Sequence, residues 1–568
     1  MTIPECLVPS LAAGVIAETD AAAAALLVDV ARRDAAARGE RCDPDPIAWL
    51  GMCLALRSPR DGHTCVDLDH GRDWAGDIDF TAADQPAWPT TAAEWSAALA
   101  AVTPLVGVPG ERKPFILDGA RLYLARSLAE EEGIARVIRG DTGVDVRILL
   151  GGPGTGKTTT VAADLVRRFA AAGPRPRLAL AAPTAKAAAR MTAVLRARCT
   201  DDAALAELGV AVDPEVRTAV LAAVDAAPAT TVHKLLGANP RGRRLFAFDE
   251  TDPLPYDLVI VDECSMLSGS LMHRLLVALD RGTELTLVGD PDQLASVEAG
   301  SVLADIREIA AAEGWEAAGR SRTLTEQRRF QDAPAIGALA AAIRGGRAAD
   351  ALDALTGATA HVTWVETGRP QDLDAVVERV VAEARGLCAA AVRRADDVLA
   401  RKERMQVLCA AREGPRGVSG WNRRIESQLG DLARGQWYAG RPVMVTRNSR
   451  SLGLANGDVG VVVPSAGGRM EGVFDADARP VRVPVARLED VATVHALTIH
   501  KSQGSEYDHV VVVLPDRASP LLTRELLYTA VTRGRRHVTL IGGEDVITAA
   551  IERPIRRATG LAGRLGVY

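Results

Sequence analysis

One glycine-rich segment has the composition and the spacing of a phosphate-binding loop. Residues 151–158 are Gly-Gly-Pro-Gly-Thr-Gly-Lys-Thr, a complete match to the pattern G-x-x-x-x-G-K-[ST]. The segment follows an apolar run, 146–150, and opens a helical pattern over 158–171. In such a setting backbone N–H groups surround nucleotide phosphates, the lysine neutralises their charge and the next hydroxyl binds Mg²⁺. The predicted nucleotide contacts are Gly151, Gly152, Pro153, Gly154, Thr155, Gly156, Lys157, Thr158 and Thr159, with Thr158 as a Mg²⁺ ligand.

Two acidic residues are candidates for the hydrolytic step. The apolar run 258–261 ends in Asp262 and Glu263, about a hundred residues after the glycine-rich loop. Asp262 can hold Mg²⁺, and Glu263 can orient and deprotonate the attacking water. An Asp-Glu pair after a strand is common by itself, so its order and distance relative to the loop carry the prediction.

A glutamine follows the next apolar run. The chain continues from 285–288 into Gly289-Asp-Pro-Asp-Gln293. If this strand neighbours the one that ends at Asp262, Gln293 can reach the γ-phosphate and hydrogen-bond either the phosphate or the water. A turn-forming Gly-Asp-Pro-Asp stretch is explained equally well as a plain loop.

Seven segments, in order, resemble the motifs of superfamily 1 DNA helicases of the RecD type, and two of them contain the acidic pair and the glutamine described above. They are Ia at 182–186, Ib at 231–237, II at 262–266, III at 289–300, IV at 324–329, V at 497–506 and VI at 527–533. The resemblance covers roughly residues 115–545. Segments 410–420 and 440–448 further resemble the RecD subunits of exonuclease V (RecBCD). Stand-alone RecD-like helicases usually carry a longer N-terminal extension, which we do not find in this sequence.

The resemblance implies that ATP lies in a cleft between two α/β domains. Arg329 and Arg533 would reach the transferred phosphate, and Tyr123 would pack against the adenine. Two alternatives stay open. The adjacent Arg328 could take the place of Arg329, and Tyr123 could be a core residue on a helix.

The resemblance also implies a groove for single-stranded DNA across both domains. Thr184, Lys186, His233, Thr498 and His500 would supply phosphate contacts or stacking surfaces. His233 could equally be a buried histidine with its polar atoms satisfied. The implied direction of travel is 5′→3′.

The order of apolar runs and helical patterns predicts an α/β fold. We expect two RecA-like P-loop domains with parallel sheets, at 106–345 and at 346–434 plus 493–568. Turns such as Asn456-Gly457 between valine-rich runs predict a small all-β insert at 435–492, SH3-like by resemblance. Residues 1–105 would form a mostly helical N-terminal domain.

Charge separates this N-terminal region from the rest. Residues 1–100 hold 16 acidic residues against 7 arginines, a net charge of −9, whereas the other 468 residues have a net charge of +3. An acidic region would repel phosphates, and it holds four of the eight tryptophans: Trp49, Trp74, Trp88 and Trp95. We expect it to bind protein partners, by resemblance RecB- and RecC-like subunits, although these tryptophans could instead fill a local core.

Three functions compete on these grounds. The favoured one is an ATP- and Mg²⁺-dependent helicase motor acting on single-stranded DNA and duplex ends in break repair and recombination. The second is a nucleotide-binding subunit that regulates a partner nuclease without moving along DNA. A self-contained nuclease is disfavoured, because no cluster of acidic residues with a lysine lies outside these motifs. Scattered cysteines, no long apolar run and no basic N-terminal segment predict a cytoplasmic protein without disulfides.

Overall fold

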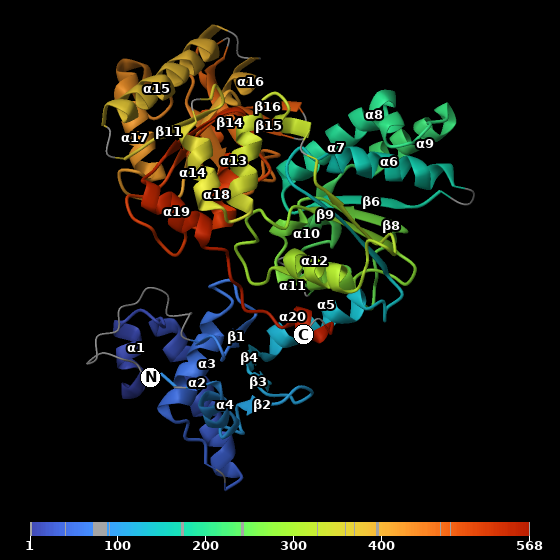
Figure 1. Cartoon of the computed structure of the whole chain (residues 1–568), viewed down its shortest axis with the longest axis vertical. Coiled ribbons are helices and arrows are strands. Elements are labelled where there is room, and N and C mark those ends of the chain that lie inside the picture. The colour runs from blue at the N-terminus through green and yellow to red at the C-terminus, as the bar shows by residue number, and fades with distance from the viewer. Residues whose placement is uncertain are drawn as a thin grey trace.

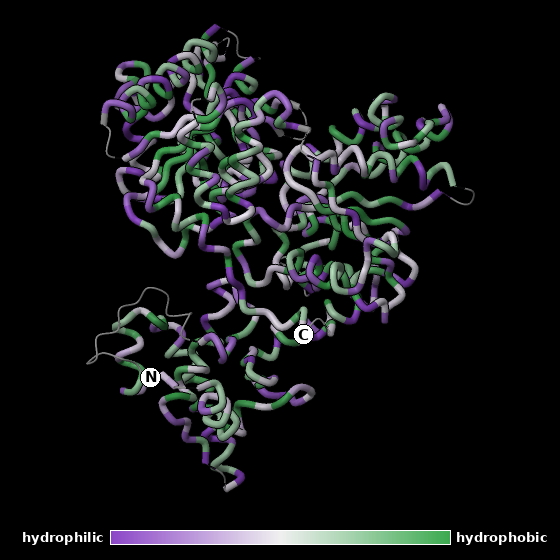
Figure 2. Tube along the Cα trace, viewed as in Figure 1, coloured by the Kyte–Doolittle hydropathy of each residue, from purple (hydrophilic) through white to green (hydrophobic). Residues whose placement is uncertain are grey.

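The computed structural model describes residues 3–39, 41–71, 88–89, 91–171, 175–239, 244–326, 328–357, 359–367, 370–393, 397–465, 467–476 and 479–566. Within these ranges the strands form four sheets. Figure 1 shows an N-terminal region, two α/β domains beside each other, and the C-terminus lying near helix α5. Hydrophobic residues gather along the strands of the α/β domains (Figure 2).

The N-terminal region is mostly helical and contains one small sheet. Its helices are α1 (Val8–Ala12), α2 (Glu18–Ala37), α3 (Pro46–Arg57) and α4 (Ala92–Ala100). The strand order is β1-β4-β3-β2, with β1 (Cys65–Asp67), β2 (Val106–Gly107), β3 (Phe115–Asp118) and β4 (Arg121–Leu124). The predicted boundary at 105 is therefore too early. Phe115 and Leu122 are buried in the same core as the N-terminal helices, which places residues 106–124 in this region.

Two of the N-terminal tryptophans are core residues. Trp49 is 5% exposed and Trp95 is 2% exposed. The ring of Trp88, which is partly buried, lies 5.5 Å from the ring of Trp95. Trp74 lies outside the described residues. The alternative of a local core thus holds for Trp49 and Trp95, and these two side chains are not a free docking surface.

The first α/β domain is built on a parallel sheet with strand order β10-β5-β9-β8-β6-β7. The strands are β5 (Asp145–Gly151), β6 (Leu178–Ala182), β7 (Thr230–Thr231), β8 (Leu258–Val261), β9 (Glu284–Gly289) and β10 (Ser321–Leu324). The helices are α5 (Ala125–Ile138), α6 (Lys157–Ala170), α7 (Ala185–Cys199), α8 (Asp202–Glu207), α9 (Pro214–Ala226), α10 (Val232–Leu235), α11 (Gly269–Val277) and α12 (Val302–Ala312). Because all strands run the same way, the loops that follow β5, β8 and β9 meet at one edge.

The second α/β domain has a parallel sheet with strand order β11-β20-β19-β12-β18. Its strands are β11 (Val362–Val365), β12 (Met405–Cys409), β18 (Ala496–Thr498), β19 (Tyr507–Val513) and β20 (Gly534–Ile541). Its helices are α13 (Pro334–Arg344), α14 (Ala348–Thr356), α15 (Pro370–Arg393), α16 (Val398–Lys402), α17 (Val418–Leu429), α18 (Arg524–Val531) and α19 (Glu544–Glu552). Both domains thus have the predicted RecA-like layering of helices on a parallel sheet. The predicted boundary at 345 is too late, because Ile336 and Leu339 of α13 are buried in the core of the second domain.

The predicted all-β insert is an antiparallel sheet with strand order β16-β15-β14-β13-β17. Its strands are β13 (Pro442–Val445), β14 (Val459–Pro464), β15 (Met470–Ala476), β16 (Arg479–Pro484) and β17 (Val491–Thr493). Phe474, which is fully buried, lies in the insert core with valines of β13 and β14. The turn at Gly457, with φ of +94°, permits the tight connection before β14.

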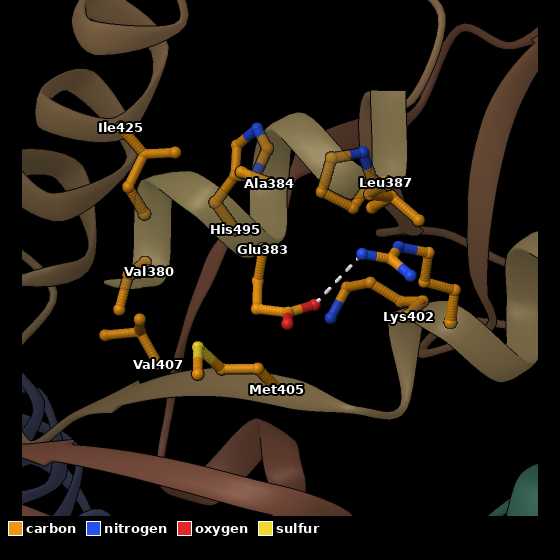
Figure 3. Close-up of a pocket in the computed structure, with 11 residues that line it drawn as sticks. Val380, Glu383, Ala384, Leu387, Lys402, Met405, Val407, Ile425 and His495 are labelled. Atoms are coloured by element: carbon orange, nitrogen blue, oxygen red, sulfur yellow. Dashed lines mark hydrogen bonds and ion pairs between the residues drawn. The ribbon is translucent and has the colours of Figure 1, made fainter. Parts of the chain in front are cut away.

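A buried polar network joins the insert to the second α/β domain. Tyr438 of the insert segment hydrogen-bonds the ring of His495 at 2.7 Å. The side chain of Gln406 donates to the carbonyl of His495 at 2.9 Å, and Lys402 hydrogen-bonds Gln406. Beside it lies a cavity of about 40 Å³ between α15, α16 and β12, where Glu383 pairs with Arg401 at 3.5 Å (Figure 3). A space of this size holds one or two waters rather than a nucleotide. The cavity therefore lies beside the contact between the insert and the second domain and is not a nucleotide site.

The end of the chain does not stay in the second domain. Helix α20 (Leu561–Arg564) packs against α5 and α12, and Leu561 is buried in the core of the first domain. The prediction that assigned 493–568 wholly to the second domain is therefore wrong for its last residues. Leu561 and Leu565 supply the apolar part of this contact.

We predict that Trp95 stabilises the N-terminal region. Trp95→Ala leaves a cavity in that core and should lower the free energy of unfolding of this region by about 3–5 kcal/mol. The exposed Val30, replaced by alanine, should change it by less than about 0.5 kcal/mol. Chemical unfolding followed by tryptophan fluorescence, with limited proteolysis, measures both. Equal effects of the two variants would contradict the core assignment.

Candidate active site

The glycine-rich loop has the geometry that its sequence predicts. It connects β5 to α6, whose first residue is Lys157. Gly156 has φ of +91° and Gly154 has φ of +77°, a backbone conformation that favours glycine. A Cβ on Gly154 would collide with the side chain of Arg329, so this glycine also allows a close approach. The ammonium of Lys157 donates to the carbonyls of Gly151, at 2.6 Å, and Gly152, at 3.1 Å.

The acidic pair lies at the end of β8. The carboxylate of Asp262 accepts a hydrogen bond from the backbone of Glu263 at 2.8 Å. Burial, and then the charge of Glu263, raise the pKa of Asp262, while Lys157 opposes this shift. Among the described residues, Glu263 alone combines a side chain with a positive φ, of +52°. Such a conformation costs roughly 1–3 kcal/mol and is typical of functional sites.

Gln293 lies where the two α/β domains meet. Strand β9 is between β5 and β8, so the loop after it reaches the same edge as Lys157 and Asp262. The Gln293 amide donates to Asp290 at 3.0 Å and accepts from Arg533 of the second domain at 2.9 Å. Tyr528 of α18 also donates to Asp290, at 3.2 Å. The loop that follows β9 therefore contacts residues of motif VI directly.

Both predicted arginines reach this cleft. Arg533 is 2% exposed and donates to the backbone carbonyls of Thr529, at 3.1 Å, and Ser505, at 3.3 Å. Arg329 lies against Gly154 of the phosphate-binding loop. The side chain of Arg328 lies outside the described residues. Arg329 is therefore adjacent to the phosphate-binding loop.

A glutamate joins arginines from both sides of the cleft. Glu506 of motif V pairs with Arg329 and with Arg190 of α7, each at 2.6 Å. Burial by itself raises the pKa of Glu506, but the charges of Arg329 and Arg190 outweigh it and lower that pKa to about 2. Glu506 therefore stays ionised at neutral pH and links α7 to the second domain.

The residues present fit a bound nucleoside triphosphate. The loop offers backbone N–H groups at the N-terminus of α6, and Lys157 supplies a cation beside them. Within the described residues the Nη1 of Arg329 is buried without a hydrogen-bond partner, and a phosphate oxygen is an acceptor of the kind it lacks. Thr158 and Asp262 are hard oxygen ligands suited to Mg²⁺. The described residues contain no group of three or more His, Cys, Asp or Glu that could hold a metal by itself.

The structure does not support the role predicted for Tyr123. This tyrosine lies on β4, not on a helix, and is 0% exposed. Its hydroxyl donates to Glu131 at 3.1 Å, and the guanidinium of Arg564 lies over its ring. With its ring fully buried and its hydroxyl bonded, Tyr123 has no surface for an adenine. The core alternative is the correct one.

The predicted DNA contacts differ in exposure: the two histidines are exposed, and the other three residues are not. His233 and His500 are exposed, and the ring of His233 lies 6.2 Å from that of Phe246. The alternative of a buried His233 is therefore wrong. Thr184 caps α7, and Thr498 is 8% exposed. Lys186 donates to Ser505 of motif V at 2.9 Å, and its burial lowers its pKa. Motifs Ia and V thus meet across the domain boundary.

Sequence reasoning missed several residues of this cleft. Glu506 stands inside motif V, but its two arginine partners are 177 and 316 residues away in the sequence. No local pattern indicates such pairs. Tyr528 and Thr529 are similar cases: they lie within motif VI, yet their partners Asp290 and Leu294 belong to the first domain.

Comparison with known proteins places the chain in a family. The model described as "RecBCD enzyme subunit RecD, N-terminal domain" matches residues 12–123, the AAA domain model matches 135–299, and the UvrD-like helicase C-terminal domain model matches 493–541. The first of these ends at β4, in agreement with the sheet that joins residues 106–124 to the N-terminal region.

Individual relatives extend this match over most of the chain. The RecBCD enzyme subunit RecD of Mycolicibacterium smegmatis is 42% identical, over 92% of this chain and 94% of its own. The ATP-dependent RecD2 DNA helicase of Deinococcus radiodurans is 31% identical, over 78% of this chain and 53% of its own. The solved structure of a Bacteroides Pif1 bound to single-stranded DNA is 17% identical, with a TM-score of 0.38, over 72% of this chain and 91% of its own. The chain belongs to the RecD family of helicase subunits.

Proposed function

We propose that this chain is the 5′→3′ motor subunit of a RecBCD-type helicase–nuclease that acts on DNA ends in double-strand break repair and recombination. Membership of the RecD family makes it an ATP-dependent DNA helicase. The observation that carries the motor assignment is the cleft itself. Gly154 of the phosphate-binding loop packs against Arg329, and Gln293 accepts a hydrogen bond from Arg533 of the second domain.

Each of these side chains has a separate role in the proposed hydrolysis of ATP. Lys157 and the loop backbone bind the β and γ phosphates, and Glu263 orients a water and accepts its proton. When bound, Mg²⁺ held by Thr158 and Asp262 would supply charge neutralisation on the phosphate oxygens. Arg329 and Arg533 stabilise the charge that develops on the transferred phosphate, contacts worth roughly 10³–10⁵ in rate.

Contacts across the cleft link this chemistry to movement. Gln293 reports on the γ-phosphate and hydrogen-bonds Arg533, so the phosphate and motif VI compete for the same side chain. The DNA-facing motifs Ia and V meet through Lys186 and Ser505. Closing and opening of the cleft would then change the grip of the Thr184, His233, Thr498 and His500 region on single-stranded DNA. Alternate gripping by the two domains moves the strand.

Lys157→Gln separates a motor from a regulatory scaffold. The variant removes the charge that neutralises the phosphates but keeps a side chain of similar reach. DNA-stimulated ATP hydrolysis should fall by orders of magnitude, because transition-state charge is no longer neutralised. Binding to single-stranded DNA without nucleotide should persist. The measurements are ATPase rates and 5′→3′ translocation on a tailed substrate, within the assembled complex.

The same measurements can overturn the proposal. A wild-type complex without DNA-stimulated hydrolysis by this chain, or a Lys157→Gln variant that translocates normally, would favour a subunit that regulates a partner nuclease. Lys113→Gln is the matched control, because it changes the same residue type outside the helicase motifs. It should leave hydrolysis close to that of wild type, because Lys113 lies in the N-terminal region, away from the nucleotide loop and the DNA-facing motifs.

Glu506→Gln tests the link across the cleft. Removing this carboxylate leaves buried Arg329 without its counter-charge, which should cost roughly 3–5 kcal/mol of stability. The pKa of Glu506 is lowered from 4.5 to about 2 in the folded chain. Its contribution is therefore complete above about pH 4.5 and is lost as the pH falls toward 2.

The check is thermal unfolding of both proteins as a function of pH. The difference between wild type and Glu506→Gln should be the same at pH 7 and pH 5 and should shrink below pH 4.5. Asp431→Asn, which removes an ion pair between two exposed side chains, should change stability by about 1 kcal/mol or less. A pH-independent difference would show that the charge of Glu506 is not what links the domains.

We also propose that the N-terminal region binds the RecB- and RecC-like partners. Its core tryptophans are unavailable, but Leu26 and Val30 stand one helical turn apart on α2 and are 51% and 48% exposed. An exposed apolar pair on an acidic helical region suits a protein partner better than phosphates.

Leu26→Asp with Val30→Asp should weaken this association without unfolding the region, because both side chains already contact solvent. Val108→Asp is the control, since Val108 is 57% exposed elsewhere in the same region. Co-purification of the three subunits after co-expression measures the effect. If the double variant assembles as fully as the control, the partners bind another surface.

A further inference from the structure

The C-terminal strap, residues 553–566, crosses from the second α/β domain back to the first. It leaves α19 at Arg553 and ends with α20 against α5 and α12. Figure 1 shows this red segment running from the second domain to the neighbourhood of α5. None of the helicase motifs includes it, and the chemistry described above does not use it.

One residue of the strap holds the loop that carries Gln293. The guanidinium of Arg557 donates to the backbone carbonyls of Glu298, at 2.9 Å, Gly300, at 2.7 Å, and Ser296. All three acceptors lie at the far end of motif III, a few residues after Gln293. Only a side chain with several donors in a fixed arrangement can bond to three carbonyls of an irregular loop at once. A planar guanidinium supplies this arrangement, and a lysine does not.

The N-terminal region adds a second contact to the same loop. Gly300 donates its N–H to the carbonyl of Gly62 at 3.0 Å. The strap is tied there too, because Thr64 donates to the carbonyl of Ala558 at 3.0 Å and Ala558 donates to His63 at 2.8 Å. A Cβ on Gly62 would stand 3.1 Å from the guanidinium carbon of Arg557, so the two segments are closely packed.

The near end of the loop is held by the second domain. Leu294 receives a hydrogen bond from Gln503 at 3.0 Å and donates to Thr529 at 3.0 Å. Gln293 is therefore in a loop whose two ends contact different bodies: motifs V and VI at one end, the strap and the N-terminal region at the other. A shift at either end moves the amide that faces the γ-phosphate.

We propose that Arg557 is a positioning residue for ATP hydrolysis: by holding three carbonyls of the motif III loop, it sets the place of Gln293. This inference rests on the proposed role of Gln293 at the γ-phosphate. Arg557 does not touch the nucleotide-binding loop, so it acts on turnover rather than on nucleotide affinity. Because Gly300 also bonds to Gly62, the position of Gln293 depends on the docking of the N-terminal region.

The test compares Arg557→Ala with Arg564→Ala in the full chain. Arg564 lies in the same strap and pairs with Asp118 at 2.5 Å and with Glu131 at 3.4 Å, but it does not bond to the motif III loop. Both variants loosen the strap, and only the first releases the loop. The readouts are kcat and KM for ATP in DNA-stimulated hydrolysis, with a thermal melt to confirm folding.

We expect Arg557→Ala to lower kcat about tenfold or more, since small displacements of catalytic groups are costly, while KM changes less than about twofold. Arg564→Ala should keep kcat within about twofold of wild type. Added guanidinium ion should restore part of the lost kcat in Arg557→Ala alone, because it can occupy the space that the side chain left. Arg557→Lys, which keeps charge but not the planar array of donors, should show an intermediate kcat.

Two results would overturn the inference. Equal losses of kcat in the Arg557→Ala and Arg564→Ala variants would show that strap docking alone matters. A normal kcat in Arg557→Ala would show that the loop positions itself. If Arg557→Ala does not fold, Arg557→Lys decides the question by the same criterion, a lowered kcat with a nearly unchanged KM. Gln293→Ala is measured in parallel: a normal kcat there refutes the role of Gln293, whereas a low kcat there with a normal Arg557→Ala refutes only the positioning role.

Discussion

The hydrogen bond between Gln293 and Arg533 is the interaction on which the proposed coupling between the nucleotide site and the two domains depends. It joins the end of a strand in one parallel sheet to a helix end in the other, at 2.9 Å and away from solvent. A buried arginine must find acceptors wherever it lies, and here it takes them from both domains. Any group that displaces Gln293 from Arg533 therefore changes how the two domains fit together. A change at the proposed nucleotide site is therefore also a change in the contact between the two domains.

Much of the first domain could be predicted because its functional residues follow strands of one parallel sheet. Lys157, Asp262 and Gln293 each come after an apolar run, and strand order brings them to one edge. What could not be predicted are contacts between distant segments, such as Glu506 with Arg329, for which spacing in the sequence carries no information. The predicted contact of Tyr123 with the adenine was wrong for the same reason. Its neighbours Glu131 and Arg564 belong to a helix and to the end of the chain, and they enclose it.

The domain boundaries show where composition is a poor guide. Charge and tryptophan content change near residue 100, yet β2, β3 and β4 pair with β1 and extend the N-terminal region to residue 124. Short strands of two to four residues hold little periodicity, so hydrogen bonding to a distant partner decides their membership. Helix α20 is a similar case. Leu561 in this helix and Leu565 just after it join the core of the first domain.

The chain passes between the two α/β domains at two places, and together these two connections limit how the cleft can open. One crossing lies between the end of β10 at Leu324 and the start of α13 at Pro334. The other lies between Glu552 and Leu561, a span that reaches at most about 3.5 Å per residue. Bodies tied at two points turn most easily about the line through those points. Because the second tie also bonds to the motif III loop through Arg557, opening of the cleft pulls on the segment that carries Gln293. In the proposed mechanism the strap therefore makes Gln293 sensitive to domain rotation, in addition to the direct contact of Gln293 with Arg533.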